Sequence, residues 1–334
     1  FATIGMMLMA GANDFIVIFL GIELMSLSLY VLAGFMRTSD RSNEAALKYF
    51  LLGAFATGFL LYGIALIYGA SGTTNLPAIG AQLPLLWPKW SFLVGVGLVT
   101  TAFAFKVAAV PFHMWAPDVY EGAPTTVTAF MSTGAKAAAF AAFVLVFLQT
   151  LKVSGTKVNE VIAIIAASSM VVGNVVAIAQ SNIKRMLAYS SIAHAGYMLS
   201  GIAAGNSEGQ TGILFYVVAY TFMNIGAFGV VSLMENEEDK NLQLEDYAGL
   251  SRQRPYLAAL MAVFMFSLAG IPPFAGFFGK YYVFLSAVKA NMTWLAIVGV
   301  LTSLVSAYYY LRIVVMMYFR DGEGNVGAKP ALTS

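Results

Sequence analysis

The chain has 334 residues, of which 60% are hydrophobic and 10% are charged, so it has too little polar surface to form a water-soluble globule. Its formal net charge of +2 provides no dense basic face for nucleic acid. It contains no cysteine and only two histidines. The lack of cysteine excludes disulfides and iron–sulfur ligation, so we expect no metal or redox centre in this chain. The hydrophobic composition indicates an integral membrane protein.

Apolar segments of about twenty residues follow one another along the chain, each long enough to cross about 30 Å of hydrocarbon as a helix. After a fragment at residues 1–12, we predict nine spans near 14–36, 45–69, 92–120, 124–151, 159–180, 184–204, 210–234, 256–288 and 292–319. The chain begins at Phe1 with no basic segment before it, so we expect no signal peptide and a start truncated within a helix.

Two of these spans are interrupted by proline. The third contains Val110–His113 (VPFH), and the eighth contains Gly270–Pro273 (GIPP). A proline frees a helical carbonyl, which at membrane depth must face protein or water, so we predict two broken helices that line a hydrated cavity. The two breaks lie five helices apart. Because five is odd, the second repeat would cross the membrane in the opposite direction to the first.

The sequence therefore predicts an all-α, polytopic transmembrane bundle with two inverted five-helix repeats, each containing a broken helix. The first repeat is placed at 1–151 and the second at 152–320, followed by a polar tail at 321–334. Of the longer connections, 70–91 is rich in Gly, Pro and Thr, and 235–255 contains Leu242–Tyr247 (LQLEDY), which we expect along the membrane surface.

Lysine and arginine are distributed unevenly between the two sets of loops. One set holds Arg37, Arg41, Lys48, Lys184, Arg185, Lys240, Arg252, Arg254, Arg320 and Lys329, whereas the other holds Lys89, Lys152, Lys157 and Lys289. Positive residues in short loops stay on the cytoplasmic side. The first set is therefore predicted to be cytoplasmic.

Four charged residues remain at membrane depth: Glu23, Lys106, Lys136 and Lys280. Each such charge costs about 2.5–3.5 kcal/mol on insertion scales, and its default reading is functional. Desolvation disfavours a buried ammonium and a nearby carboxylate favours it, so a moving partner switches protonation. We predict a proton relay in which Glu23 and Lys106 form the switching pair, Lys136 follows and Lys280 is the terminal site.

His194 is the fifth candidate for this relay. Ser190, Ser191 and Tyr197 lie at offsets of −4, −3 and +3 from it, which places a polar stripe on one face of an otherwise apolar helix. This stripe is predicted to hold water between Lys136 and Lys280.

Each candidate also has a structural interpretation. An intramembrane lysine or glutamate can clamp helices together, and a lone histidine is often a satisfied core residue. His113, beside the first break, fits either role equally. The aromatic run Tyr308–Tyr310 is predicted to pack or to anchor the chain at the interface.

Three motifs resemble the proton-translocating antiporter-like subunits of respiratory complex I, the NADH:quinone oxidoreductase. They are Leu20–Ser26 (LGIELMS), Lys106–Pro124 (KVAAVPFHMWAPDVYEGAP) and Ala269–Phe277 (AGIPPFAGF), and the resemblance covers essentially the whole chain. The surroundings of Glu23 and Lys280, with Ser190–Tyr197 (SSIAHAGY), are most similar to the subunit N branch, the counterpart of mitochondrial subunit two.

The resemblance implies a complete subunit of fourteen helices, of which this chain covers the fourth to the thirteenth. It maps Glu23, Lys106, Lys136 and Lys280 onto relay positions in the fifth, seventh, eighth and twelfth helices, with His194 between them in the tenth. It also implies a multi-pass subunit of a bacterial inner membrane that moves protons in step with quinone reduction elsewhere. NADH, FMN, iron–sulfur clusters and quinone would be bound by partner subunits, and the neighbours would include other antiporter-like subunits.

Two other classes of function share some of these features. A subunit of a multisubunit Na⁺/H⁺ antiporter or of a membrane-bound hydrogenase has the same motifs. A non-catalytic membrane scaffold has similar helices, but substitution of its intramembrane charges would leave transport unchanged.

Overall fold

The computed structural model describes residues 1–235 and 242–321, and every regular element within these ranges is a helix. The first half contains α1 (Ala2–Ala10), α2 (Phe15–Ala33), α3 (Asp40–Ser71), α4 (Leu76–Ala81), α5 (Leu83–Leu86), α6 (Trp90–Lys106), α7 (Trp115–Gly122), α8 (Thr125–Phe130), the π-helix η1 (Met131–Ala135), α9 (Lys136–Phe143) and the π-helix η2 (Val144–Thr150). The second half contains α10 (Lys157–Ile178), α11 (Ile183–Ala204), α12 (Ser207–Met234), the 3-10 helix η3 (Leu244–Tyr247), α13 (Leu250–Gln253), α14 (Pro255–Ala269), α15 (Ala275–Lys289) and α16 (Thr293–Phe319).

Each of the nine predicted spans corresponds to a helix or to a broken pair of helices. In the described ranges, six helical segments are long and apolar enough to cross a membrane: α2, α3, the run from α8 to η2, α10, α12 and α16. α6 and α14 are shorter because each ends at a break. The prediction of an all-α transmembrane bundle is confirmed. The division at residue 151 stays a prediction, and the tail from residue 322 onward lies outside the described residues.

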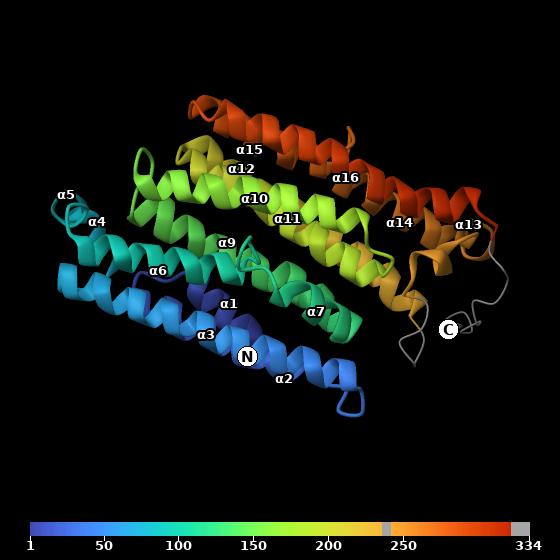
Figure 1. The fold of residues 1–334 in the computed structure, drawn as a ribbon, viewed down its shortest axis with the longest axis horizontal. Helices are drawn as coiled ribbons and strands as arrows, with labels where there is room; N and C mark the ends of the chain where they lie inside the picture. The colour runs from blue at the N-terminus through green and yellow to red at the C-terminus, as the bar shows by residue number, and fades with distance from the viewer. Residues whose placement is uncertain (236–241, 322–334) are drawn as a thin grey trace.

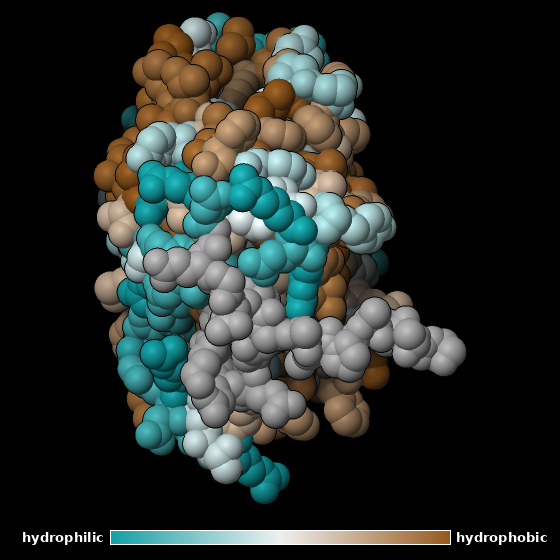
Figure 2. All heavy atoms as spheres, turned by 90° about the vertical axis from the view of Figure 1, so that its right-hand side faces the viewer, coloured by the Kyte–Doolittle hydropathy of each residue, from teal (hydrophilic) through white to brown (hydrophobic). Residues whose placement is uncertain are grey.

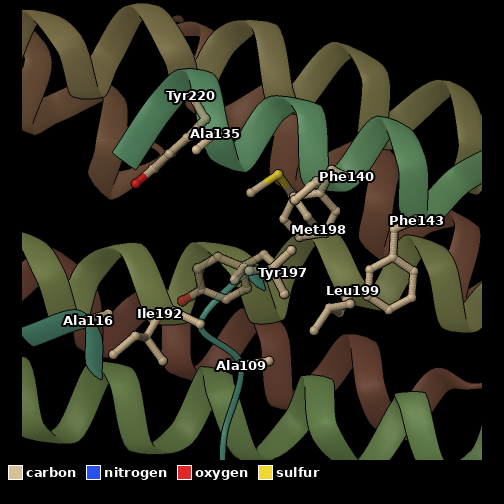
Figure 3. Packing of buried hydrophobic residues seen from close by; sticks show 14 of the residues in the cluster. Ala109, Ala116, Ala135, Phe140, Phe143, Ile192, Tyr197, Met198, Leu199 and Tyr220 are labelled. Carbon is tan, nitrogen blue, oxygen red and sulfur yellow. The ribbon is translucent and has the colours of Figure 1, made fainter. Parts of the chain in front are cut away.

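The predicted span at 184–204 forms α11, although its polarity keeps it out of the apolar set. All of its residues except Arg185 and Tyr189 are buried, and it packs against α7, α10, α12 and α15. Because other helices shield it from lipid, α11 can carry serine and histidine at membrane depth. Figure 3 shows part of the surrounding core, with Met198 and Leu199 of α11 near Phe140 and Phe143 of α9.

Residues between α6 and α7 form the first break, directly after Lys106. The amide of Val110 donates to Oγ of Ser169 in α10 at 2.9 Å, and Nε1 of Trp115 donates to the Phe105 carbonyl at 2.9 Å. Groups freed from the helix are thus bonded by protein side chains, as the low dielectric of a membrane demands. Ser169 belongs to the second half of the chain, so the two halves meet at this break.

The second break separates α14 from α15. Gly270 ends α14 at a φ of 84°, a left-handed conformation that glycine adopts without strain. The carbonyls of Leu268 and Ala269 have no continuing helix to pair with, and both accept from Nζ of Lys280. A Cβ at Gly270 would lie 3.1 Å from that nitrogen, so glycine also leaves room for the lysine.

Glycines allow close helix crossings at similar places in the two halves. In the first half, a Cβ at Gly5 of α1 would lie 2.6 Å from the carbonyl oxygen of Gly21 in α2. In the second, a Cβ at Gly173 of α10 would lie 2.6 Å from the amide of Ala193 in α11. Small residues at such crossings bring helix backbones together in membranes. The recurrence supports the proposed repeat.

The loops gather at two opposite ends of the bundle, as the charge distribution predicts. In Figure 1 the long helices run along the molecule, with α4 and α5 at one end and α7 and α13 at the other. We call the second of these the basic end. Figure 2, which looks onto the basic end, shows hydrophilic residues gathered there and hydrophobic residues around its flanks. A polar end with apolar flanks is the arrangement expected of a membrane-spanning bundle.

Ion pairs at the basic end tie three helices together. Asp118 of α7 pairs with Lys48 of α3 at 2.7 Å and with Arg185 of α11 at 2.8 Å, and Arg185 also reaches Glu121 at 2.8 Å. These residues line a cavity of about 200 Å³. At the opposite end, Lys289 pairs with Glu208 at 2.7 Å.

Single-cysteine labelling tests the orientation, since the native chain has no cysteine. Thr38→Cys in the exposed loop before α3 is expected to react with a membrane-impermeant maleimide from the cytoplasmic side only, because it lies at the basic end. Ser154→Cys, also exposed, is expected to react from the other side only. Ser42→Cys is the control, because Ser42 is buried and its cysteine should react only after denaturation. Labelling of positions 38 and 154 from one face would contradict the topology.

Candidate functional site

The five predicted relay residues lie on five different helical segments in the interior of the bundle. Lys106, Lys136, His194 and Lys280 are 9%, 3%, 1% and 4% exposed, and Glu23 is half-buried. The three lysines among these candidates each require polar partners, because an unpaired ammonium in a low dielectric is costly. Within the described ranges, no group of three or more His, Cys, Asp or Glu side chains is arranged to hold a metal ion.

Glu23 and Lys106 each hydrogen-bond to a hydroxyl group rather than to each other. Oε1 of Glu23 accepts from Oγ1 of Thr57 in α3 at 2.7 Å. Nζ of Lys106 donates to Oγ of Ser26 at 2.7 Å, and Ser26 lies one turn after Glu23 on the same helix, α2. No ion pair joins Glu23 to Lys106 in the described structure, so this conformation holds the predicted switching pair apart.

Lys136 begins α9 directly after the π-helix η1. Its Nζ donates to the Ser191 carbonyl at 2.7 Å and to Oγ of the same serine at 2.5 Å. The ammonium also lies 5.7 Å from the ring centroid of Tyr220, within cation–π range. A π-helical turn shifts the register of the side chains that follow and is frequent at functional sites. Here it places a lysine against α11.

His194 uses both of its ring nitrogens. Nδ1 lies 2.8 Å from the hydroxyl of Tyr216 in α12, and Nε2 lies 3.0 Å from the hydroxyl of Tyr310 in α16. The same Tyr310 hydroxyl is hydrogen-bonded to Oγ of Ser190, one turn before His194. The predicted polar stripe on α11 therefore contacts three other helices, through Ser190, Ser191 and His194.

Lys280 reaches back from α15 into the second break. Nζ donates to the carbonyls of Leu268 and Ala269 at 3.0 and 2.8 Å and to Oγ of Ser303 in α16 at 2.9 Å. It also lies 5.0 Å from the ring centroid of Tyr197. The carbonyls are the last of α14, where the negative end of the helix dipole favours a cation.

The structure thus brings the candidates together in two groups. Glu23 and Lys106 form the first. The second consists of His194 on α11 together with Lys136 and Lys280, which contact α11 through Ser191 and Tyr197. No hydrogen bond among the described residues joins the two groups.

Among the hydroxyl partners, the sequence singled out Ser190 and Ser191 of the α11 stripe and none of the others. Ser26 has a local signal, since it lies three residues after Glu23 and so on the same helix face. Tyr310 was expected to pack or to anchor at the interface, but it is buried and its hydroxyl bonds His194. Tyr216 and Ser303 carry no local signal, because their contacts depend on how α12 and α16 pack around α11.

Comparisons with known proteins agree over nearly the whole chain. Residues 12–306 match the family described as NADH:quinone oxidoreductase/Mrp antiporter, TM. NADH-quinone oxidoreductase subunit N of Trichlorobacter lovleyi is 58% identical over 325 residues, which are 97% of this chain and 67% of the relative. This chain therefore spans about two thirds of that protein.

Two solved structures have the same arrangement of helices. A chain of respiratory complex I from Thermus thermophilus with bound aureothin superposes with a TM-score of 0.83 at 40% identity, over 96% of this chain and 71% of that one. A chain of the Mrp complex from Dietzia sp. DQ12-45-1b superposes with a TM-score of 0.87 at 26% identity, over 95% of this chain and 59% of that one.

Proposed function

Because this chain belongs to the NADH:quinone oxidoreductase/Mrp antiporter transmembrane family, we propose that it is the proton-translocating subunit N of a bacterial NADH:quinone oxidoreductase. The resemblance stated from the sequence motifs is confirmed. The identities of 58% to a subunit N and 26% to an Mrp chain favour this assignment over a Na⁺/H⁺ antiporter subunit. The bacterial inner membrane is the location that the proposal implies.

One observation carries the proposal: buried amines lie against groups that accommodate both of their protonation states. An ammonium has three N–H donors and no acceptor, whereas a neutral amine has two donors and one lone pair. A hydroxyl can accept from the first and donate to the second. Lys106, Lys136 and Lys280 are each bonded to a serine hydroxyl, from Ser26, Ser191 and Ser303 in turn.

The proposed order of transfer follows the two groups of residues. A proton held by Glu23 or Lys106 passes to Lys136, and from there along the polar face of α11 past His194 to Lys280. Burial keeps the amines from exchanging protons freely with bulk water. A change in the surroundings of one lysine can therefore alter the proton affinity of the next lysine. The step from Lys106 to Lys136 requires water or a conformational change, since no bond joins them in the described structure.

The electron-transfer chemistry belongs, on this proposal, to other subunits. NADH, FMN, iron–sulfur clusters and quinone are assigned to them, and this chain contributes proton-carrying side chains. Its partners in the membrane are the other membrane subunits of the complex, among them further antiporter-like subunits, and lipid covers the remaining apolar flanks.

Replacing Lys136 with methionine tests the proposal directly. In the intact complex, Lys136→Met is expected to lower proton translocation by roughly tenfold or more, because a positioned proton-transfer group contributes about 10²–10⁴-fold. Lys157→Met is the matched control, since Lys157 is exposed and lies outside the buried groups. Translocation is measured as membrane-potential formation in vesicles, and assembly is checked on native gels. Normal pumping by an assembled Lys136→Met complex would favour the scaffold alternative.

A further inference from the structure

The hydroxyl of Tyr310 is a junction between two polar residues of α11. It is hydrogen-bonded to Oγ of Ser190 and to Nε2 of His194, and Nδ1 of His194 continues to the hydroxyl of Tyr216. All four side chains are at most 1% exposed. The result is an unbroken row of hydrogen bonds from α11 through α16, back to α11 and on to α12.

Each member of this row can both give and receive a proton. Hydroxyl groups are donors and acceptors, and a neutral imidazole has one nitrogen of each kind. When Nδ1 of His194 carries the proton, it donates to Tyr216 and Nε2 accepts from Tyr310, whose oxygen then accepts from Ser190. The opposite tautomer reverses every bond. The row therefore has two consistent directions, and the imidazole sets which one holds.

Each end of the row lies next to a residue that binds or immediately precedes a buried lysine. Ser190 is adjacent to Ser191, which binds Nζ of Lys136. At the other end, the ring of Tyr216 packs against Gly279, since a Cβ there would lie 2.8 Å from its Cδ2. Gly279 immediately precedes Lys280. The row thus runs from the residue next to the Lys136 partner Ser191 to the helix that carries Lys280, α15.

We propose that Tyr310 is a proton-carrying residue of this subunit, which passes protons between Ser190 and His194; this inference rests on the proposed function. Tyr310 gives its hydroxyl proton to Nε2 of neutral His194 and takes the hydroxyl proton of Ser190, which the incoming proton replaces. Nδ1 gives its proton to the oxygen of Tyr216, whose own hydroxyl proton leaves. One proton enters, one leaves and every group is neutral again, with His194 in its other tautomer.

The row must be reset before a second proton can pass in the same direction. The hydroxyls rotate and the imidazole ring turns until its N–H again faces Tyr216, and only then can Tyr310 donate to the bare ring nitrogen again. The row therefore transfers one proton at a time. It also separates Lys136 from Lys280 by neutral groups, so the two ammonium ions do not have to approach each other.

Tyr309 provides a matched control on the same helix. It is equally buried, at 1% exposed, and its hydroxyl donates to Oδ1 of Asn174 in α10 at 2.9 Å rather than to His194. Phenylalanine at either position removes one buried hydroxyl group together with its hydrogen bonds and keeps the aromatic ring. Substitution of Tyr309 therefore has a similar packing effect and removes a neighbour of the Tyr310 hydroxyl, but it removes no member of the row itself.

The test compares Tyr310→Phe and Tyr309→Phe in the intact complex, with potential formation in vesicles as the readout and native-gel assembly as a check. We expect Tyr310→Phe to lower the pumping rate by roughly tenfold or more and Tyr309→Phe to change it less than about twofold. Equal rates for the two assembled variants would overturn the inference. If Tyr310→Phe pumps normally while Lys136→Met does not, Tyr310 is not a carrier but the proposed function stands. If all three pump normally, the proposed function also fails.

A second variant separates carrying a proton from positioning His194, and it covers the case in which Tyr310→Phe fails to assemble. Incorporation of 3-fluorotyrosine at position 310 keeps the hydrogen bonds but makes the phenol more acidic. The pumping rate at a fixed pH is expected to change severalfold with fluorotyrosine at position 310 and to stay the same with fluorotyrosine at position 309. An unchanged rate at position 310 would show that the phenol only holds the imidazole in place.

Discussion

Lys280→Met is expected to leave the subunit inserted and assembled while removing most of its proton translocation and slowing the quinone reduction coupled to it. Methionine keeps a similar stem beside Tyr197 and removes a charge that costs about 2.5–3.5 kcal/mol at membrane depth. It also leaves the carbonyls of Leu268 and Ala269 without their donor, a loss of about 1–3 kcal/mol that partly offsets the gain. The defect should therefore be in transport rather than in assembly.

Lys280→Arg distinguishes a carrier from a fixed charge. A guanidinium would still cap the end of α14, but it stays protonated throughout the cycle and cannot release a proton. We expect Arg at position 280 to pump as poorly as Met.

The measurements are quinone-reductase activity and membrane-potential formation in vesicles that contain the intact complex. Lys289→Met is the control, because Lys289 lies on the same helix but pairs with Glu208 at the exposed end. Full pumping with Arg at position 280 would show that a permanent positive charge suffices, and Lys280 would then have to be removed from the relay.

Glu23→Gln and Lys106→Ala are each expected to reduce pumping strongly, and Glu23→Asp is expected to be milder because it keeps the carboxylate. In the structure the two residues are held by hydroxyls rather than by each other, with Thr57 on Glu23 and Ser26 on Lys106. A switching pair needs such alternative partners, because the charged residues must separate and meet again during each cycle.

A double-mutant cycle on the same two positions tests whether they act together. If they form one switch, Glu23→Gln combined with Lys106→Ala should be little worse than either single change, since groups that act as a unit give non-additive losses. Ser26→Ala should have a smaller effect, because it removes one bond but neither charge. Normal pumping by both assembled single variants would make the pair structural and would leave the relay without its gate.

The sequence is informative about the features that the bilayer constrains directly, namely the length of the spans, the breaks at proline and the charges at membrane depth. Length and hydropathy predicted all nine spans, and the prolines at Pro111 and Pro273 marked both breaks. Glu23 and the three lysines were identified because charges are rare at membrane depth, and His194 because of the polar stripe around it. The structure buries all of them except Glu23, which is half-buried. These signals are local, so a single sequence contains them.

The partners of those residues depend on helix packing and could not be predicted in the same way. Serine and tyrosine are common in membrane helices, so nothing in the run Tyr308–Tyr310 shows that Tyr310 bonds His194 while Tyr308 is exposed. No sequence signal predicted the π-helical turn before Lys136, although this turn determines which residues the lysine contacts.

The bond from Ser169 to Val110 has a consequence for how a duplicated fold evolves. The backbone at the first break is completed by a side chain from the other half of the chain, just as Lys136 takes Ser191 and Ser132 takes Asn224 from that half. In the other direction, Arg185 of the second half pairs with Asp118 and Glu121 of the first, so neither proposed repeat satisfies all of its own polar groups. When each half provides hydrogen-bond partners for the other, a substitution in one half is tolerated only if it still fits the partner residues in the other half. The side chains of the two repeats can then diverge while the symmetry of their backbones is kept.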